Sequence, residues 1–301
     1  MSKKENLKPS EDKILCYTLA NGQARAYVAK TNGMVSAARQ THALSNVATA
    51  ALGRTLTFTA ILGVQMKGDG DRMSITVKGD GPLGTITTAA KSDGTVKGFL
   101  DNPSAELMLR PDGKLNVGAA VGTRGRITVI KDLGLKEPYI GNVEIQTGEL
   151  GEDFAYYLYT SEQQPSAVAL GVLIKGGEVA SAGGVILSPL PGCSEEVLKF
   201  LEHSVPLIAD VSSLFEGNTA EEVGEILFYP VQHTLEETYY PRYHCDCSRE
   251  RLEQVLMSLN ADELSEMIEQ QGGAQITCHF CNETYEFSAA ELERYRAGKN
   301  G

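Results

Sequence analysis

Two short cysteine motifs near the C-terminus decide how the rest of the chain is interpreted. The first is His244-Cys245-Asp246-Cys247-Ser248, and the second is Thr277-Cys278-His279-Phe280-Cys281. Four thiolates close a tetrahedral zinc shell with Zn–S bonds of about 2.3 Å. The second motif has the spacing of a zinc knuckle, whereas the first must bend an extended chain before its sulfurs converge. The sequence predicts one zinc ion per chain, bound by Cys245, Cys247, Cys278 and Cys281.

The segment between the motifs is predicted to bring them together. Ser248 can cap a helix whose apolar residues repeat at helical spacing over 252–259. Asn260 and Glu263 have capping-box spacing for a second short helix, which ends at Gly272. We expect the two helices to run antiparallel and return the chain. A strand over 285–287 and a last short helix follow.

The predicted zinc-binding domain, residues 239–301, has few large apolar side chains. A module of about 60 residues is marginal on core burial alone. Zinc binding in small sites contributes about 10–16 kcal/mol, so metal binding and folding should form one equilibrium.

The composition indicates a folded chain with about two domains, since 42% of its 301 residues are hydrophobic. There is no apolar segment after Met1 and no run of 18 apolar residues, so we expect a cytoplasmic protein without a membrane partner. In a reducing cytoplasm, clustered cysteines are more often metal ligands or redox sensors than permanent disulfides. Cys16 and Cys193 lie outside the cluster, and we expect both to be small buried apolar residues.

The negative charge is concentrated in the C-terminal part of the chain. Residues 186–301 hold 7 Lys and Arg against 21 Asp and Glu, a net charge of −14, whereas the whole chain carries −12. A zinc module that binds nucleic acid needs cations around the metal. We therefore expect no nucleic-acid partner, and we interpret Arg249 and Arg251 as solvated helix residues paired with neighbouring carboxylates.

The rest of the chain predicts an α+β fold. Residues 1–189 should form a sheet-rich core domain packed around a helix, with a hairpin turn at Asn21-Gly22 and helical sequence over 31–65. We expect short strands from 71 to 187, one of them over 154–159. His42 lies in the helical part and is predicted to be structural.

Residues 190–238 are predicted to form a linker of short amphipathic helices. Ser194 and Thr219 can cap two of them, and Pro206 suits the first turn of another. Such short helices need a surface to pack on. The chain has no phosphate loop, GxSxG or HExxH motif, so we expect no enzymatic activity.

The sequence resembles the redox-regulated 33 kDa heat-shock chaperonin family. The resemblance rests on the CxC motif at 245–247 and the CxxC motif at 278–281, which are separated by the thirty residues 248–277. These thirty begin with Ser248-Arg249-Glu250-Arg251. Glycine-rich stretches such as Gly148-Glu149-Leu150-Gly151 and Ala182-Gly183-Gly184 extend it across the chain.

The resemblance implies an ATP-independent holdase that binds unfolded client proteins under oxidative stress. It implies that oxidants joined with unfolding conditions link Cys245 to Cys247 and Cys278 to Cys281, that zinc leaves, and that the zinc-binding domain and linker unfold. It also implies that the active form is a homodimer. Thiolates are the form that oxidants attack, and each disulfide would close a very small loop once the domain opens.

Two other functions fit parts of the sequence. A thiol–disulfide oxidoreductase would use the CxxC motif, although such motifs usually begin a helix in a βαβ unit. A static zinc-binding interaction module would keep its metal under oxidant.

Overall fold

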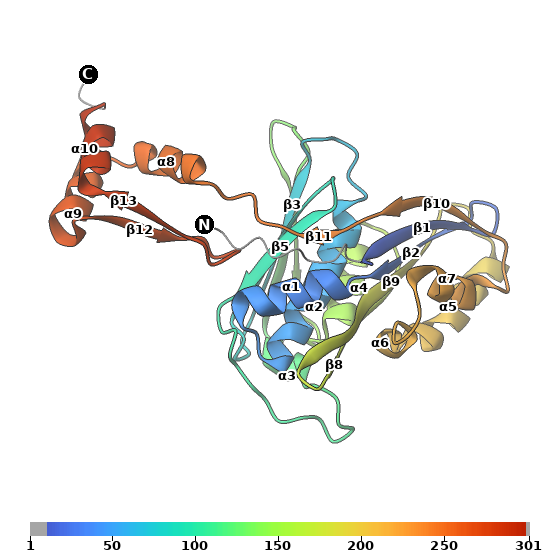
Figure 1. The fold of residues 1–301 in the computed structure, drawn as a ribbon. Coiled ribbons are helices and arrows are strands. Elements are labelled where there is room, and N and C mark those ends of the chain that lie inside the picture. Colours follow the sequence, from blue (N-terminus) through green and yellow to red (C-terminus); the bar gives the residue numbers. More distant parts are fainter. Residues whose placement is uncertain (1–10, 299–301) are drawn as a thin grey trace. The chain divides into compact units, whose positions relative to one another are not determined.

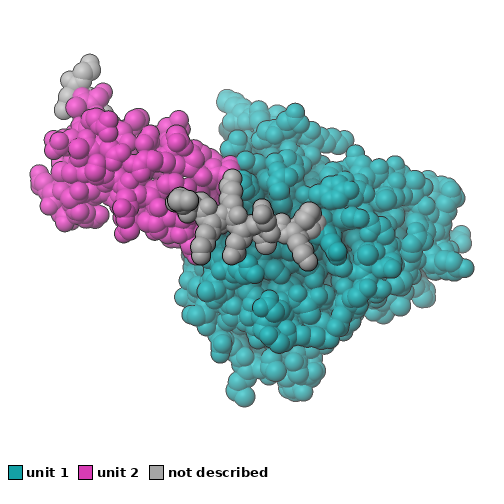
Figure 2. Space-filling view, in the orientation of Figure 1, with its two compact units in different colours: residues 1–244 teal, residues 245–301 magenta. Residues whose placement is uncertain are grey.

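The computed structural model describes residues 11–298, and the chain forms two compact units. Unit 1 comprises residues 1–244 and unit 2 residues 245–301 (Figure 2). Residues 190–238 lie within unit 1, and the division of the chain into three functional parts stays a prediction. None of the described helices is both long and apolar enough to cross a membrane.

One sheet of unit 1 has five antiparallel strands in the order β10-β1-β2-β9-β8 (Figure 1). Its members are β1 (Lys13–Leu19), β2 (Ala24–Lys30), β8 (Ala167–Lys175), β9 (Glu178–Pro189) and β10 (His233–Tyr239). The predicted hairpin joins β1 to β2. Asn21 and Gly22 have φ angles of 56° and 87° there, which is the region that turn residues of this kind tolerate.

The second sheet of unit 1 has six strands in the order β11-β5-β4-β3-β6-β7. They are β3 (Arg72–Gly79), β4 (Thr85–Lys91), β5 (Thr95–Leu100), β6 (Gly125–Asp132), β7 (Tyr139–Glu144) and β11 (Arg242–Tyr243). The β11–β5 pair is parallel. Tyr243 Oη donates to the Gly98 carbonyl and lies 2.8 Å from His42 Nε2. The prediction that His42 is a structural residue is therefore confirmed.

Helix α2 (Asn46–Gly63) contacts strands of both sheets and forms the centre of the main core. The predicted helical segment over 31–65 divides into α1 (Asn32–His42) and α2, because Ala43 takes a left-handed φ of 48° and ends α1. Buried threonines of α2 are hydrogen-bonded, as in the contact of Thr59 with Thr88 at 2.7 Å. The prediction of a helix inside a sheet-rich domain is confirmed. Helix α3 covers Val117–Val121.

The strand predicted over 154–159 is wrong, because these residues lie in helix α4 (Leu150–Ser161). The buried residues Leu150, Phe154, Tyr157 and Leu158 follow a helical period and face the core. Asp153 is fully buried in the first turn and accepts hydrogen bonds from the backbone N–H groups of residues 146–148. These contacts outweigh the strand preference of the aromatic residues.

Three helices follow β9 and pack on the five-stranded sheet. They are α5 (Glu195–Ile208), α6 (Val211–Leu214) and α7 (Ala220–Phe228). The predicted caps at Ser194 and Thr219 are confirmed. Pro206 lies inside α5 and not in a first turn, which corrects the prediction. The helix continues past it because Leu201 and Ile208 bury the same face against the second core cluster.

Unit 2 contains the predicted two helices, strand and last helix in the predicted order, together with an additional strand, Gly273–Thr277, that was not predicted. It consists of α8 (Arg249–Ser258), α9 (Ala261–Gln271), β12 (Gly273–Thr277), β13 (Thr284–Ser288) and α10 (Ala289–Ala297). Ser248 caps α8, Asn260 and Glu263 form the capping box of α9, and Gly272 ends α9 with a φ of 66°. The buried core of this unit is small and comprises Leu256, Leu264, Ala274, Phe287 and Leu292.

Candidate metal centre

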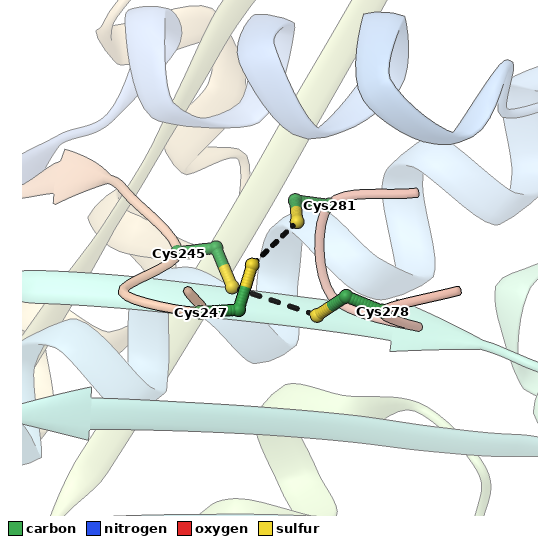
Figure 3. A group of neighbouring side chains, drawn as sticks. All are labelled: Cys245, Cys247, Cys278 and Cys281. Carbon is green, nitrogen blue, oxygen red and sulfur yellow. Dashed lines mark hydrogen bonds between the residues drawn. The ribbon is translucent and has the colours of Figure 1, made fainter. Parts of the chain in front are cut away.

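The two cysteine motifs of unit 2 lie at the N-terminal end of α8 and in the turn between β12 and β13. Cys247 immediately precedes Ser248, whose side chain accepts a hydrogen bond from the Arg251 N–H and so begins α8. Cys278 and Cys281 lie in a tight turn, in which the Asn282 N–H donates to the Cys278 carbonyl at 2.8 Å. The turn points both of its sulfurs toward the first motif (Figure 3).

The backbone of this turn is fixed by further hydrogen bonds. The Asn282 N–H bond to Cys278 is joined by one from the Cys281 N–H to the same carbonyl at 3.3 Å, and the Cys278 N–H donates to the Glu283 carbonyl at 2.9 Å. Asn282 takes a φ of 57°, which Asn tolerates better than most residues. The positions of both sulfurs therefore follow from the turn and not from side-chain freedom alone.

The four sulfur atoms converge, and all lie within 4.8 Å of one another. The Sγ atoms of Cys245 and Cys278 are 3.7 Å apart, and those of Cys247 and Cys281 are 3.3 Å apart. A tetrahedral shell with Zn–S bonds of about 2.3 Å places its sulfurs about 3.8 Å apart. Within residues 11–298 this is the one group of three or more potential ligands so close together. The donor set and its spacing thus fit a zinc ion.

Tyr285 supports the cluster from β13. Its Oη lies 3.3 Å from the Cys247 sulfur. Burial works to raise the pKa of the Cys247 thiol, but hydrogen bonds from Tyr285 and the other cysteines outweigh burial and lower that pKa. Burial raises the pKa of Cys281, and the hydrogen bond with the Cys247 sulfur adds to the rise.

Arg249 connects the start of α8 to the rest of unit 2. It donates to the Glu286 carbonyl at 2.6 Å and to Glu291 at 2.7 Å, and its guanidinium lies 4.3 Å from the centre of the Phe287 ring. It also pairs with Glu253, as expected, at 3.5 Å. The interpretation of Arg249 as a merely solvated residue is wrong, because most of its partners come from β13 and α10.

Arg251 is exposed and paired with a nearby carboxylate, as predicted. It binds Asp246, the residue between the two cysteines of the first motif, at 2.9 Å. The ion pair connects the residue between the two cysteines of this motif to α8. No motif in the sequence predicts the contact of Arg251 with Asp246 or that of Tyr285 with Cys247.

The two remaining cysteines lie in unit 1. Cys16 is buried on β1, as predicted, and desolvation raises the pKa of its thiol. Cys193 is only partly buried beside the second core cluster, so the expectation of full burial is wrong for it.

Comparisons with known proteins find similarity to one family along nearly the whole chain. The family model described as Hsp33 protein matches residues 12–288. The 33 kDa chaperonin of Clostridioides difficile is 44% identical over 282 residues, which cover 93% of this chain and 97% of that protein. The 33 kDa chaperonin of Bacillus subtilis is 42% identical over 286 residues, which cover 94% and 97%.

A solved structure of a 33 kDa chaperonin is also similar to this chain along nearly its whole length. The crystal structure of the 33 kDa chaperonin (heat shock protein 33 homolog) from Thermotoga maritima matches with a TM-score of 0.88 at 33% identity. The match covers 97% of this chain and 99% of that one. This chain belongs to the Hsp33 family of 33 kDa chaperonins.

Proposed function

We propose that this chain is a redox-regulated, ATP-independent holdase that binds unfolding client proteins in the cytoplasm under oxidative stress. In the reduced state, Cys245, Cys247, Cys278 and Cys281 bind one zinc ion. In the oxidised state, Cys245 pairs with Cys247 and Cys278 with Cys281. The active form is proposed to be a homodimer. Membership of a chaperonin family supports the chaperone activity, and the cysteine cluster supports its control by oxidation.

The observation that carries the proposal is the imbalance between the cysteine cluster and the apolar core of unit 2. Among the described residues, five buried side chains form its core, Ala274 among them, and seven partly buried apolar side chains pack against these five. Cores of domains this small rarely supply more than about 3–5 kcal/mol. A bound zinc ion would keep the four sulfurs as thiolates and contribute about 10–16 kcal/mol to folding. The fold of unit 2 should therefore depend on the oxidation state of its sulfurs.

Oxidation removes the thiolate donors. Each disulfide takes two electrons from a pair of thiolates, and one molecule of hydrogen peroxide accepts them, together with two protons from the solvent, to give two molecules of water. Cys278 and Cys281 share one turn, so they remain close together after unit 2 opens. A disulfide between residues two or three positions apart also strains the chain, and strained disulfides are more easily reduced. Cellular reductants should therefore reverse the change.

Helices α5 to α7 would transmit the change to a client-binding surface. Their apolar faces cover the five-stranded sheet, and the cluster between them includes Leu15, Val185 and Phe215. Only β10 and β11 separate α7 from the first cysteine motif along the chain. We propose that these helices loosen when unit 2 unfolds, which would expose apolar surface on the sheet and on the helices. Exposed apolar patches of this kind bind unfolded proteins.

The position of the CxxC motif weighs against a thiol–disulfide oxidoreductase. Cys278 and Cys281 lie in a turn between two strands, whereas a catalytic CxxC gains its reactive thiolate from a helix N-terminus. The acidic C-terminal part of the chain likewise weighs against a static module that binds nucleic acid.

The proposal can be tested on the full-length reduced protein loaded with zinc. Peroxide at elevated temperature should release the metal and produce an active holdase, which suppresses aggregation of a chemically denatured client without ATP. Dithiothreitol should reverse both effects. A variant with Ser at all four cluster positions is the matched control for oxidation elsewhere, at Cys16 or Cys193. Metal release without any gain in suppression would contradict the proposal.

A further inference from the structure

The edge strand β10 adds backbone pairing to the five-stranded sheet and contributes little to the core of unit 1. Its core contacts come from its two ends, where Tyr239 packs against the main core and the His233 ring lies 6.0 Å from that of Tyr17. Its seven side chains, all of them described, are partly or fully exposed. The neighbouring strand β1 buries Ile14, Leu15, Cys16, Tyr17 and Leu19. Removal of β10 would therefore leave the core nearly complete and open a strand edge of seven residues.

The pairing of β10 with β1 is also interrupted. In the register, Cys16 faces Glu237 and Tyr17 faces Leu235, so Glu236 is an extra residue at a bulge. Bulges disrupt the ladder of backbone hydrogen bonds, and charged residues on an edge strand discourage pairing with other chains. The β10–β1 ladder therefore consists of six residue pairs that the bulge divides into two runs of three.

The edge of β1 adjoins the apolar surface that α5 to α7 cover. Leu15, Tyr17 and Leu19 point into the cluster beneath these helices, and the Tyr17 ring lies 5.3 Å from that of Phe228 in α7. Because β10 directly follows α7 in the chain, loosening of the helices removes the anchor at the start of β10. An open backbone edge and an exposed apolar face would then lie side by side on one strand.

We propose that the β1 edge, vacated by β10, accepts an extended segment of an unfolded client as a new strand of the five-stranded sheet. The inference rests on the proposed holdase function and names its mode of recognition. Backbone hydrogen bonds would supply affinity without sequence preference, as in other cases of strand addition. A segment of alternating apolar residues would fit best, because one of its faces meets Leu15, Tyr17 and Leu19. On this face, β10 itself contributes the contacts of the His233 ring with the rings of Tyr17 and Phe228.

Amide hydrogen exchange at single-residue resolution tests this on the full-length chain. Successive N–H groups of a strand point alternately to its two neighbours, so one half of the β1 amides faces β10 and the other half faces β2. Oxidation should speed exchange at the β10-facing amides alone. Reduced, carboxymethylated α-lactalbumin, which stays unfolded and has no free thiol, should restore their protection. The β2-facing amides serve as the internal control.

Each outcome has a distinct meaning. Binding of the client without renewed protection of the β10-facing amides would overturn the inference and leave the proposed function intact. Continued protection of these amides in the oxidised chain would also overturn it. An oxidised chain that binds no client would refute the proposed function, and the inference with it.

A pair of variants gives a second measurement. Glu237→Val places a β-branched residue opposite Cys16 and should strengthen the β10–β1 pair. Glu236→Val makes the same change in charge and shape at the bulge, where there is no opposing residue. Cross-strand pairs of this kind shift a pairing equilibrium by about 2- to 5-fold. The oxidised Glu237→Val chain should bind the client more weakly than the Glu236→Val chain by this factor, and equal affinities would contradict the inference.

Discussion

Arg249 provides a quantitative test of the link between metal binding and folding in unit 2. Arg249→Ala removes hydrogen bonds to the Glu286 carbonyl and to Glu291, and the contact with the Phe287 ring. A hydrogen bond to a charged group contributes about 1.5–3 kcal/mol, and an exposed cation–π contact about 0.5–1 kcal/mol. The side chain is 37% exposed, so solvent weakens both. We expect the substitution to destabilise folded unit 2 by about 2–3 kcal/mol.

If the metal binds only the folded unit, this loss becomes a loss of apparent zinc affinity. Each 1.4 kcal/mol corresponds to a factor of about ten, so the affinity should fall about 30- to 100-fold. Competition with a chromophoric chelator on the reduced chain measures it. Arg294→Ala, at an exposed residue of α10, is the matched control. Arg249→Lys should recover only part of the zinc affinity, because a lysine ammonium cannot reproduce the geometry of the planar guanidinium group, which donates hydrogen bonds in two directions. Equal affinities for the two alanine variants would refute the reasoning.

Three further predictions concern unit 1. Phe215→Ala removes a fully buried ring and should destabilise the packing of α5 to α7 on the sheet by about 3–5 kcal/mol. The reduced Phe215→Ala chain should then suppress client aggregation in part. The control Tyr229→Ala removes a ring that is 85% exposed, and its reduced chain should not suppress client aggregation. Asp153→Ala leaves three backbone N–H groups, of which that of Gly148 is buried, without their acceptor and should lower the stability of unit 1 in urea by about 2–4 kcal/mol. Glu152→Ala, at the exposed neighbouring position, should have little effect. Hydrogen bonds to a backbone carbonyl and a nearby carboxylate raise the pKa of His233; its protonated form therefore stabilises the fold below about pH 6.5, and this stability is lost as the pH rises through the folded-state pKa. His233→Gln should lose this contribution, so the free energy of unfolding should differ more between the two chains below about pH 6.5 than at high pH.

The parts of the fold that follow local rules could be predicted from the sequence. These parts are the tight turn at the CxxC motif, the helix caps at Ser248 and Asn260, and the Asn21-Gly22 hairpin turn. Each depends on residues that are only a few positions apart in the sequence. Helix α4 could not be predicted in the same way, because its aromatic residues favour a strand locally and only the surrounding core selects a helix. Pro206 shows the same limit, since packing of α5 on the sheet keeps the helix intact.

The supporting contacts of the cysteine cluster required the structure for a related reason. Tyr285 is 38 residues from Cys247, and the partners of Arg249 on β13 and α10 are 37 and 42 residues away. Such pairs depend on which strands and helices meet, and no periodicity in a single sequence reports this. The candidate metal ligands could be found because their chemistry is concentrated in two short motifs. The residues that orient them are ordinary side chains.

The geometry of the cluster also bears on the order of events during oxidation. All four sulfurs lie within 4.8 Å of one another, so proximity in the folded unit does not favour the local pairs. The contacts of 3.7 and 3.3 Å in fact join the two motifs, across 33 and 34 residues. Once unit 2 opens, loop-closure entropy favours pairs two or three residues apart over these distant pairs by about 2 kcal/mol, which the strain of the CxC ring offsets in part.

Disulfide mapping can therefore separate two sequences of events. Oxidation of a unit that stays folded should produce bonds between the motifs, such as Cys247 to Cys281. Oxidation that proceeds through opening should produce Cys278 to Cys281 first, because this pair has the less strained path, and Cys245 to Cys247 afterwards. Peptide mapping at limiting peroxide, with and without mild heat, distinguishes the two. A predominance of bonds between the motifs under both conditions would mean that opening does not precede sulfur chemistry, and the proposed role of unfolding would have to be abandoned.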